Sequence, residues 1–304
     1  MPLWQLLAQT EAGDLATTID ALARTPLSRI LILVAVLTAV RLLVHRYILN
    51  TPPHLRGGVY PIVRFVNDTS DAIIYAAILV FLLLRPFAIQ MFRIPSGSMV
   101  FTLMVNDFIV ANKAIYRYSD PKVGDIVVFR PPKEAVPQQM LDRDGDVNVD
   151  FVKRCVGVPG QVIEVRNNVL YRDGKPVDEP YKTFTLQLGV DRFVRLSPDE
   201  VAAQPAYDFK LVKFHGQYIP LTIHGDFVND TERTAPAFRV DDVDTMAALK
   251  ALPPAPIPPG HYLMMGDNRN GSFDSRGWGL VPREAIIGRA EWIVLPIPRF
   301  GRPH

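Results

Sequence analysis

Two serines in one tight turn are the first residues of this sequence that suggest chemistry. The turn is Pro95-Ser96-Gly97-Ser98-Met99, directly behind an apolar run that ends near Phe92. The glycine permits a tight turn, so both hydroxyls and the neighbouring amide N–H groups can point at one spot. Such a turn can present a nucleophile together with an oxyanion hole, although a solvated serine-rich loop has the same composition. The interpretation therefore depends on a partner base elsewhere in the chain.

Composition limits the classes of protein to consider. The chain has 304 residues, a hydrophobic fraction of 48% and a formal net charge of +2. These values exclude a disordered chain, and no basic block argues for nucleic acid. Cys155 is the single cysteine, so no intrachain disulfide can form. The 27 prolines favour a loop-rich β protein over a helical bundle.

Two apolar segments are long enough to span a membrane. The first runs from Leu27 to Leu49, and the second, from Ala72 to Phe92, would measure about 31 Å as a helix. The first starts too far into the chain, behind acidic residues, to be a removable signal peptide. The elements that must position the serine turn therefore include two membrane helices that precede it.

The charges around these segments predict their orientation. Arg41, Arg46, Arg56 and Arg64 lie between the segments or on their flanks, whereas the residues before the first segment are mostly acidic. By the positive-inside rule the loop is cytoplasmic, so the N-terminus and everything after Phe92 face outward. The serine turn is then expected at the outer surface of the membrane.

After residue 93 the helical period gives way to short strand signals, which indicate a mainly antiparallel β domain. Turns are expected at Asn167-Asn168 and Asp173-Gly174. The expected strands are Phe108–Lys113, Ile126–Phe129, Val162–Val165, Val169–Tyr171 and Lys175–Val177.

Two stretches have the character of insertions. They are Pro131 to Asp150 and roughly Asp178 to Pro259, and the second is large enough for a small accessory domain. Asp142 to Asp146 resembles the opening of a calcium loop, but its glycine is misplaced and the twelfth position carries no glutamate, so we expect a solvated turn. The six histidines show no ligand spacing, so no metal site is expected.

Three further blocks follow the serine turn in order: Pro121–Phe129, Asp150–Gly160 and Gly266–Arg276. With these blocks behind two apolar segments, the sequence resembles the bacterial type I signal peptidases, the membrane-bound leader peptidases of the Ser-Lys class. The resemblance covers nearly the whole chain except the two insertions.

The resemblance implies a role for each matching residue. Ser98 matches the nucleophile and Lys153 the general base that takes its proton. The Ser96 hydroxyl and the Ser98 backbone N–H match the oxyanion hole, and Ser272 matches the serine that orients the lysine. A supporting ion pair is expected between Asp274 and Arg276. The residues that match the walls of the substrate pockets, and that plain core packing would also explain, are Phe92, Ile94, Met99, Leu103, Phe151 and Val152.

The resemblance also implies that Lys153 is held neutral by burial, because a free lysine titrates near ~10.4. The adjacent Arg154 is expected to face the other way, since successive strand residues face opposite sides.

The sequence departs from the family pattern at three places. Phe101-Thr102-Leu103 stands where Pro-Thr-Leu is usual, Asn106-Asp107 where Gly-Asp is usual, and Asn270-Gly271 where Asp-Asn is usual. None of these changes removes a group that does chemistry, but the first two alter the backbone just after the nucleophile.

The expected protein is a signal peptidase of the bacterial cytoplasmic membrane, multi-pass, with its β domain on the outer, periplasmic face. It cuts exported preproteins after the signal sequence through an acyl-enzyme, contacts membrane lipid, and requires no cofactor and no nucleic acid. Its expected parts are an outward N-terminal segment (1–26), membrane helix 1 (27–49), a cytoplasmic loop (50–71), membrane helix 2 (72–92), a first part of the catalytic β domain (93–177), an inserted accessory domain (178–259) and a second part of the β domain (260–304).

Two alternatives remain open from sequence. A self-cleaving repressor of the Ser-Lys type would carry a DNA-binding region and lacks such spans. A membrane-anchored paralogue that binds signal sequences without cutting them has Phe101 and Asn106 as its only support. Incubation with a preprotein separates the cutting enzyme from the paralogue.

Overall fold

A computed structural model describes residues 27–53, 56–80, 89–136, 141–142, 146–204, 207–225, 227–229 and 234–304. The chain divides into two compact units, Met1–Met91 and Phe92–His304.

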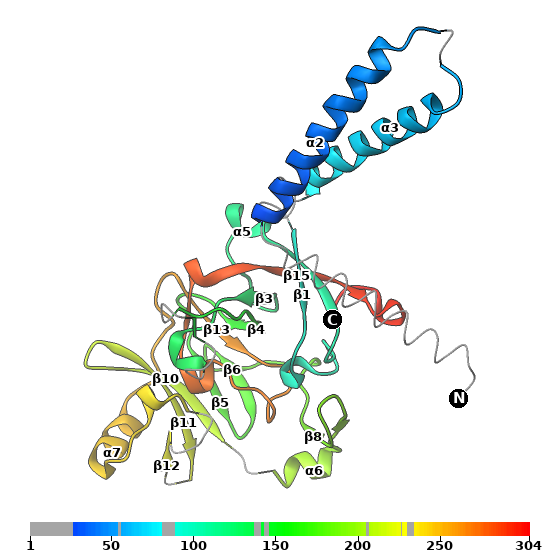
Figure 1. Ribbon diagram of the computed structural model, residues 1–304. Coiled ribbons are helices and arrows are strands. Elements are labelled where there is room, and N and C mark those ends of the chain that lie inside the picture. Colours follow the sequence, from blue (N-terminus) through cyan, green and yellow to red (C-terminus); the bar gives the residue numbers. More distant parts are fainter. Residues whose placement is uncertain are drawn as a thin grey trace. The chain divides into compact units, whose positions relative to one another are not determined.

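The first unit contains two helices, α2 (Leu27–Asn50) and α3 (Tyr60–Ala77), which lie side by side (Figure 1). An ion pair between Arg41 and Asp71 joins them. Within the described part of the chain one helix, Ser28–Asn50, is long and apolar enough to cross a membrane, and only 6% of its most apolar stretch is buried. A core helix of a soluble protein would bury that stretch, so its exposure favours a lipid environment.

The second predicted span differs from the structure at both ends. Helix α3 begins at Tyr60 rather than Ala72, and it includes the charged residues Asp68 and Asp71. At the other end, Ile89–Arg93 form strand β1, so a helix continuing to Phe92 is wrong. Backbone pairing is the reason: the Ile94 N–H, just after β1, donates to the Asp107 carbonyl over 2.9 Å. Residues 81–88 of the predicted span lie outside the described residues.

The second unit is built around a seven-stranded sheet with the order β1-β2-β15-β3-β4-β13-β14 (Figure 1). Its pairings are antiparallel from β2 to β14, as the sequence predicted for a mainly antiparallel domain. The strands after β1 are β2 (Phe108–Asn112), β3 (Ile126–Phe129), β4 (Phe151–Gly157), β13 (His261–Met265), β14 (Val281–Pro282) and β15 (Ile286–Leu295).

A second sheet of six strands has the order β12-β11-β10-β5-β6-β7, and β8 pairs with β9 in a separate hairpin. The strands are β5 (Ile163–Arg166), β6 (Val169–Arg172), β7 (Lys175–Pro176), β8 (Thr185–Gln187), β9 (Phe193–Arg195), β10 (Asp208–Phe214), β11 (Gln217–His224) and β12 (Phe227–Val228). Short helices connect the strands: α5 (Ile115–Tyr118), α6 (Pro198–Ala202), α7 (Val243–Ala251) and α8 (Ser275–Trp278).

The predicted strands and turns of the first part of this unit are confirmed to within a residue or two. The turn residues Asn167, Asn168 and Asp173 all have positive φ, followed in the last case by Gly174, as tight hairpin turns require.

The stretch from Asp178 to Pro259 is not a separate domain, which corrects the expectation from its length and proline content. Strand β10 pairs with β5, opposing Phe209 to Val165 and Lys210 to Glu164. The stretch therefore completes the sheet begun by β5 to β7, because an isolated β5–β7 meander would leave an open edge. Of the other predicted insertion, residues 137–140 and 143–145, including most of the expected calcium-like turn, lie outside the described residues.

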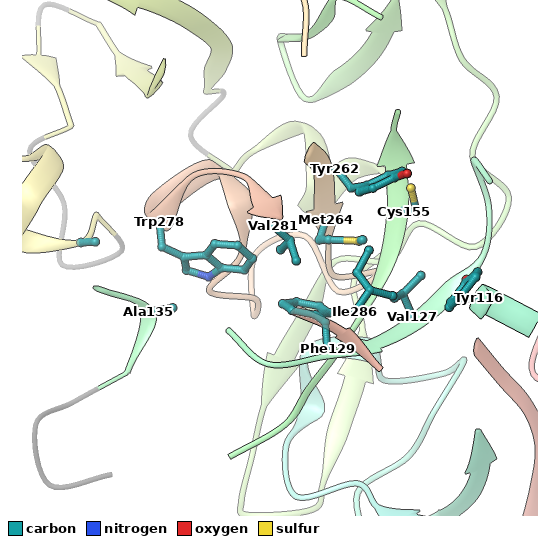
Figure 2. Close-up of a cluster of buried hydrophobic side chains, with 11 residues drawn as sticks. Tyr116, Val127, Phe129, Ala135, Cys155, Tyr262, Met264, Trp278, Val281 and Ile286 are labelled. Carbon is teal, nitrogen blue, oxygen red and sulfur yellow. The ribbon is translucent and has the colours of Figure 1, made fainter. Parts of the chain in front are cut away.

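The core beside the seven-stranded sheet explains why its central strand, β3, is uniformly apolar. All four residues of β3 are buried, as a strand covered on both faces requires. Phe129 of β3 packs against Trp278, with ring centroids 5.9 Å apart, and against Phe151 of β4 at 6.4 Å. Figure 2 shows Met264 and Cys155 in the same cluster. Strand β4 is thereby held rigidly at the centre of the unit.

A buried ion pair fixes the start of the 178–259 stretch to the loop after β13. The two guanidinium nitrogens NH1 and NH2 of Arg269 donate to the Glu179 carboxylate over 2.9 and 2.5 Å, and both side chains are almost fully buried. The Thr183 N–H donates to the Asp267 carbonyl over 2.8 Å, which adds a backbone link beside the pair.

Replacing Glu179 with glutamine should leave the Arg269 guanidinium buried without its counter-charge, which typically costs about 3–5 kcal/mol. For a protein of this size we expect the apparent Tm of the detergent-solubilised full chain to fall by roughly 6–20 °C, measured by tryptophan fluorescence. Asp146→Asn is the matched control, because the Lys133–Asp146 pair is 60% and 70% exposed; loss of such a pair costs less than about 1 kcal/mol. Equal Tm values for the two variants would contradict the anchoring role of Glu179.

Candidate active site

The serine turn is a single turn of 3₁₀ helix, Gly97–Met99, entered from Ser96 in an extended conformation. The first N–H groups of any helix have no acceptor within it, so the Ser98 N–H lies among groups left available to a ligand. Met99 and Leu103 are 1% and 0% exposed and anchor the turn in an apolar cluster. The nucleophile expected from sequence therefore sits in the middle of a well-anchored turn.

Lys153 reaches this turn from β4, an interior strand of the seven-stranded sheet. Its Nζ donates to the Ser98 Oγ over 2.8 Å and to the Val152 carbonyl over 3.1 Å. The lysine is 4% exposed, and its amine lies 5.2 Å from the centroid of the Phe151 ring. The structure thus brings together the two residues that were predicted to act as nucleophile and base.

Burial lowers the pKa of Lys153 from 10.5 to about 8. The nearby Asp274 and Asp267 carboxylates favour the protonated amine and oppose this shift, whereas Arg276 supports it. Desolvation is the largest of these effects, as expected for an amine removed from water. With a pKa near 8, about a tenth of the amines are neutral at pH 7, against roughly one in 2,500 for a free lysine.

Each of the two carboxylates near the lysine is paired with its own arginine. Arg276 donates to Asp274 over 2.8 and 2.7 Å, and Arg154 donates to Asp267 over 2.8 and 2.7 Å. Burial raises the pKa of Asp274, but the Arg276 guanidinium, together with a hydrogen bond from the Gly266 N–H and the nearby Ser272 hydroxyl, holds the pKa of this carboxyl below its usual range. The Asp274–Arg276 pair was predicted from the resemblance. The position of Arg154, bound to Asp267 instead of the serine turn, agrees with the expected alternation along β4.

The Ser272 hydroxyl does not make the predicted hydrogen bond to Lys153. Among the described residues its buried Oγ has no hydrogen-bond partner, although it lies near enough to Asp274 to lower the pKa of that carboxyl. Ser272 packs against Gly266, where an added Cβ would come within 2.3 Å of the Ser272 Oγ and 2.5 Å of the Ser98 carbonyl oxygen. The lysine is instead held by the Val152 carbonyl, a backbone contact that residue types alone do not reveal.

The Ser96 hydroxyl lies beside the nucleophile, with its Oγ 3.4 Å from the Ser98 Oγ. The two hydroxyls therefore converge on one side of the turn, as the sequence suggested.

Five of the six predicted pocket residues belong to one apolar cluster. Ile94, Met99 and Leu103 are buried in it, and Phe92 and Val152 pack against it. Phe151 belongs to the other side of β4, where it packs against the cluster around Phe129 and Trp278. The structure thus separates Phe151 from the other five and places it beside the lysine amine.

The two departures from the family pattern after the nucleophile both have positive φ. Asn106, at φ 72°, stands where glycine is usual, and its Oδ1 accepts hydrogen bonds from the Arg93 guanidinium over 2.7 and 3.2 Å. Asparagine tolerates this conformation better than other side chains, so the turn is kept. Phe101, at φ 74°, is a bulky residue in a strained conformation. The guanidinium of Arg195 lies 4.7 Å from its ring centroid.

Sequence reasoning missed the residues that fix the serine turn from outside. The Asn268 N–H donates to the Ser98 carbonyl over 3.2 Å, and its Nδ2 donates to the Gly97 carbonyl over 3.0 Å. The Phe193 ring covers Gly97 so closely that a Cβ there would lie 2.1 Å from a ring carbon. Asn268 lies in the Gly266–Arg276 block that carries the family resemblance, so a role near the site could have been inferred for it. Nothing in the sequence indicates that Phe193 contacts the turn.

No group of three or more His, Cys, Asp and Glu side chains that could hold a metal ion occurs in the ranges described above.

Comparisons with known proteins identify the family of the chain. Residues 66–295 match the family model described as signal peptidase, peptidase S26. A probable signal peptidase I-1 from Synechocystis sp. is 30% identical over 240 residues, covering 79% of this chain and 87% of the relative. Signal peptidase I from Aquifex aeolicus is 31% identical over 234 residues, covering 71% and 80%, respectively.

A relative from Pseudomonas fluorescens, signal peptidase I, is 30% identical over 254 residues and covers 75% of this chain and 72% of its own. A solved signal peptidase I from Enterococcus faecalis V583 is 21% identical and covers 56% of this chain and 97% of that chain, with a TM-score of 0.28, which is too low to support a statement about the fold. The family match and the sequence relatives show that the chain belongs to the signal peptidase family, peptidase S26.

Proposed function

We propose that Ser98 and Lys153 form the serine–lysine dyad with which this signal peptidase cuts exported preproteins after their signal sequence. The observation that carries the proposal is the 2.8 Å hydrogen bond between the buried Lys153 amine and the Ser98 hydroxyl. A buried amine with a pKa near 8 can accept a proton at working pH, which an ordinary surface lysine cannot do efficiently.

The reaction begins when the Ser98 Oγ attacks the scissile carbonyl carbon and the Lys153 Nζ takes the hydroxyl proton. Collapse of the tetrahedral intermediate breaks the peptide bond, and Lys153 returns the proton to the leaving amine. Water then attacks the acyl-enzyme, with Lys153 again as base, and releases the cleaved signal peptide. The Ser96 hydroxyl and the Ser98 N–H stabilise the oxyanion, a contribution typical of preorganised donors.

The apolar cluster beside the turn supports a preference for small side chains. Met99 and Leu103 are buried and Val152 packs against them, so the pockets that they wall are shallow. Alanine is favoured at the first and third positions before the cut, and a bulky aromatic residue at the first position is disfavoured.

The chain is membrane-anchored through α2, whose apolar surface is exposed, and we propose a second crossing by the apolar residues between Asp71 and strand β1. By the charge distribution of the sequence the loop that contains Arg56 is cytoplasmic and the β unit lies on the outer, periplasmic face, in contact with membrane lipid. The signal sequence of an exported preprotein would reach the dyad from the same membrane.

Ser98→Ala and Lys153→Ala should each reduce kcat by on the order of 10⁵–10⁶, because the two residues act as a unit. Ser96→Ala should cost less, on the order of 10²–10³, since one oxyanion donor is lost. The measurement is cleavage of a preprotein by the detergent-solubilised enzyme, with Ser119→Ala and Lys175→Ala as controls at exposed positions. Near-normal turnover by Ser98→Ala would contradict the assignment of the dyad. If the wild-type chain bound the preprotein without cleaving it, the non-cutting paralogue would be favoured.

The pH profile tests the neutral lysine. Because the pKa is lowered to about 8, kcat/KM should rise about tenfold per pH unit below pH 8 and level off above it. Lys153→Arg should be inactive throughout, since guanidinium keeps its proton at these pH values. Phe151→Ala exposes the Lys153 amine to water, so the rising part of the kcat/KM profile should move to higher pH. If kcat/KM of the wild type rose until about pH 10, or if Lys153→Arg cleaved normally, the buried lysine would not be the base.

Orientation is tested by protease accessibility in intact and disrupted spheroplasts. Protease added from outside should cut in the Pro131–Asp150 stretch of the β unit and spare the loop around Arg56. In disrupted spheroplasts both regions should be cut, which controls for intrinsic resistance. Cleavage around Arg56 alone from outside would reverse the orientation.

A further inference from the structure

One face of the β8–β9 hairpin contacts the catalytic turn. In its register Gln187 opposes Phe193 and Thr185 opposes Arg195. The Thr185 N–H and carbonyl are both bonded to the Asn270 amide, over 2.8 and 2.9 Å. The hairpin is therefore tied to the same loop that holds the serine turn, although it belongs to a stretch outside the blocks of the family resemblance.

From this position β9 contacts the catalytic turn and the residues just after it. Phe193 lies on Gly97, and Arg195 stacks on the ring of Phe101 at 4.7 Å. Met99 and Leu103 are buried in the pocket cluster, whereas Phe101, between them, is 38% exposed. The chain thus turns Phe101 away from the pockets for the signal peptide and toward the hairpin.

A cavity of about 760 Å³ lies behind Arg195. Its walls include the apolar side chains of Phe184, Leu196 and Val201, and its two cations are Arg195 and Lys182. None of the described residues that line it is acidic. The cavity therefore combines apolar walls with uncompensated positive charge, which suits a peptide segment that carries a carboxylate.

Neither cation forms an ion pair with a carboxylate of the described chain, although Glu179 and Asp178 lie near enough to Lys182 to favour its charged form. No ion pair within 4 Å involves Arg195 among the residues that the structure describes. The Lys182 Nζ donates to the Asn168 carbonyl over 3.2 Å, and the nearby Glu179 is committed to Arg269. Both charges can thus bind an incoming anion without breaking an existing pair.

The distance from the nucleophile fits the residues that follow the cut. Phe101 is three residues beyond Ser98, a span of at most about 11 Å even when fully extended. An extended substrate covers the same distance in about three residues. Arg195 contacts Phe101, which lies beyond the nucleophile in the chain, whereas Met99 and Leu103 are buried in the pocket cluster. This difference favours the residues after the cut for the segment near Arg195.

We propose that the cavity behind the β8–β9 hairpin receives the segment of the preprotein just after the cut, and that Arg195 and Lys182 bind an acidic side chain in it. The proposal rests on the proposed function, because the ligand is the second half of the same substrate. It makes Arg195 a specificity-determining residue that takes no part in the dyad.

The test uses the detergent-solubilised full chain and preproteins that differ only by Glu, Gln or Lys at the second, third or fourth position after the cut. At one or more of these positions kcat/KM should be roughly 3–10-fold higher for Glu than for Lys, as expected for one partly exposed ion pair. Arg195→Gln and Lys182→Gln should each reduce this preference, and Arg195→Glu should reverse it. The preference should also weaken in high salt.

Arg192→Glu is the matched control, because Arg192 is exposed on the same hairpin but does not line the cavity. This variant should keep the preference of the wild type. Equal kcat/KM for the Glu and Lys substrates with the wild-type enzyme would contradict the subsite without affecting the assignment of the dyad. Failure to cut even the Gln substrates would contradict the proposed function itself. A wild-type preference unchanged in Arg195→Glu, or a response to anionic lipid in place of substrate charge, would also overturn the proposal.

Discussion

The rest of the site depends on one constraint: a lysine amine beside two buried carboxylates must be able to lose its proton at working pH. Alone, either carboxylate would hold a proton on Lys153 and cancel the effect of burial. The structure resolves this by giving each carboxylate a bidentate arginine, Arg276 for Asp274 and Arg154 for Asp267. Fully paired charges exert little net field, so desolvation decides the protonation state. The ion pairs around the dyad are thus an electrostatic requirement as well as a structural support.

The same groups connect the dyad to the fold. Asp267 accepts a hydrogen bond from Thr102 over 2.6 Å, so the pair with Arg154 also holds the chain just after the nucleophile. Asp274 accepts one from the Gly266 N–H over 2.9 Å, at the point where the Ser98 carbonyl approaches most closely. The loop after β13 therefore sets the charge around the lysine and the position of the serine at once.

Motifs that carry chemistry were predictable, whereas contacts that depend on tertiary placement were not. Ser98, Lys153 and the Asp274–Arg276 pair could be named because their residue types and order are specific. Strands β2, β3 and β5 to β7 could be predicted because apolar patterning and turn residues mark them. The apolar run through Phe92 concealed the start of β1, since apolarity does not distinguish a strand from a membrane helix. Ser272 was assigned to the lysine, but local packing against Gly266 places it beside Asp274. Phe193 and Arg195 were missed because a hairpin outside the motifs gives no sign of where it docks.

The two halves of the dyad have unequal mechanical support. Lys153 lies on β4, with strands bonded on both sides, while Ser98 follows β1, the edge strand that has a neighbour on one side only. Edge elements open locally at a lower free energy than the interior of a sheet, and such an opening separates hydroxyl from amine while the core of the unit stays folded. Inactivation and global unfolding are then distinct events with distinct free energies. The reversible fraying of one edge strand, set by its short pairing with β2 and by the Asn268 contacts, would limit the fraction of molecules competent for catalysis as temperature rises.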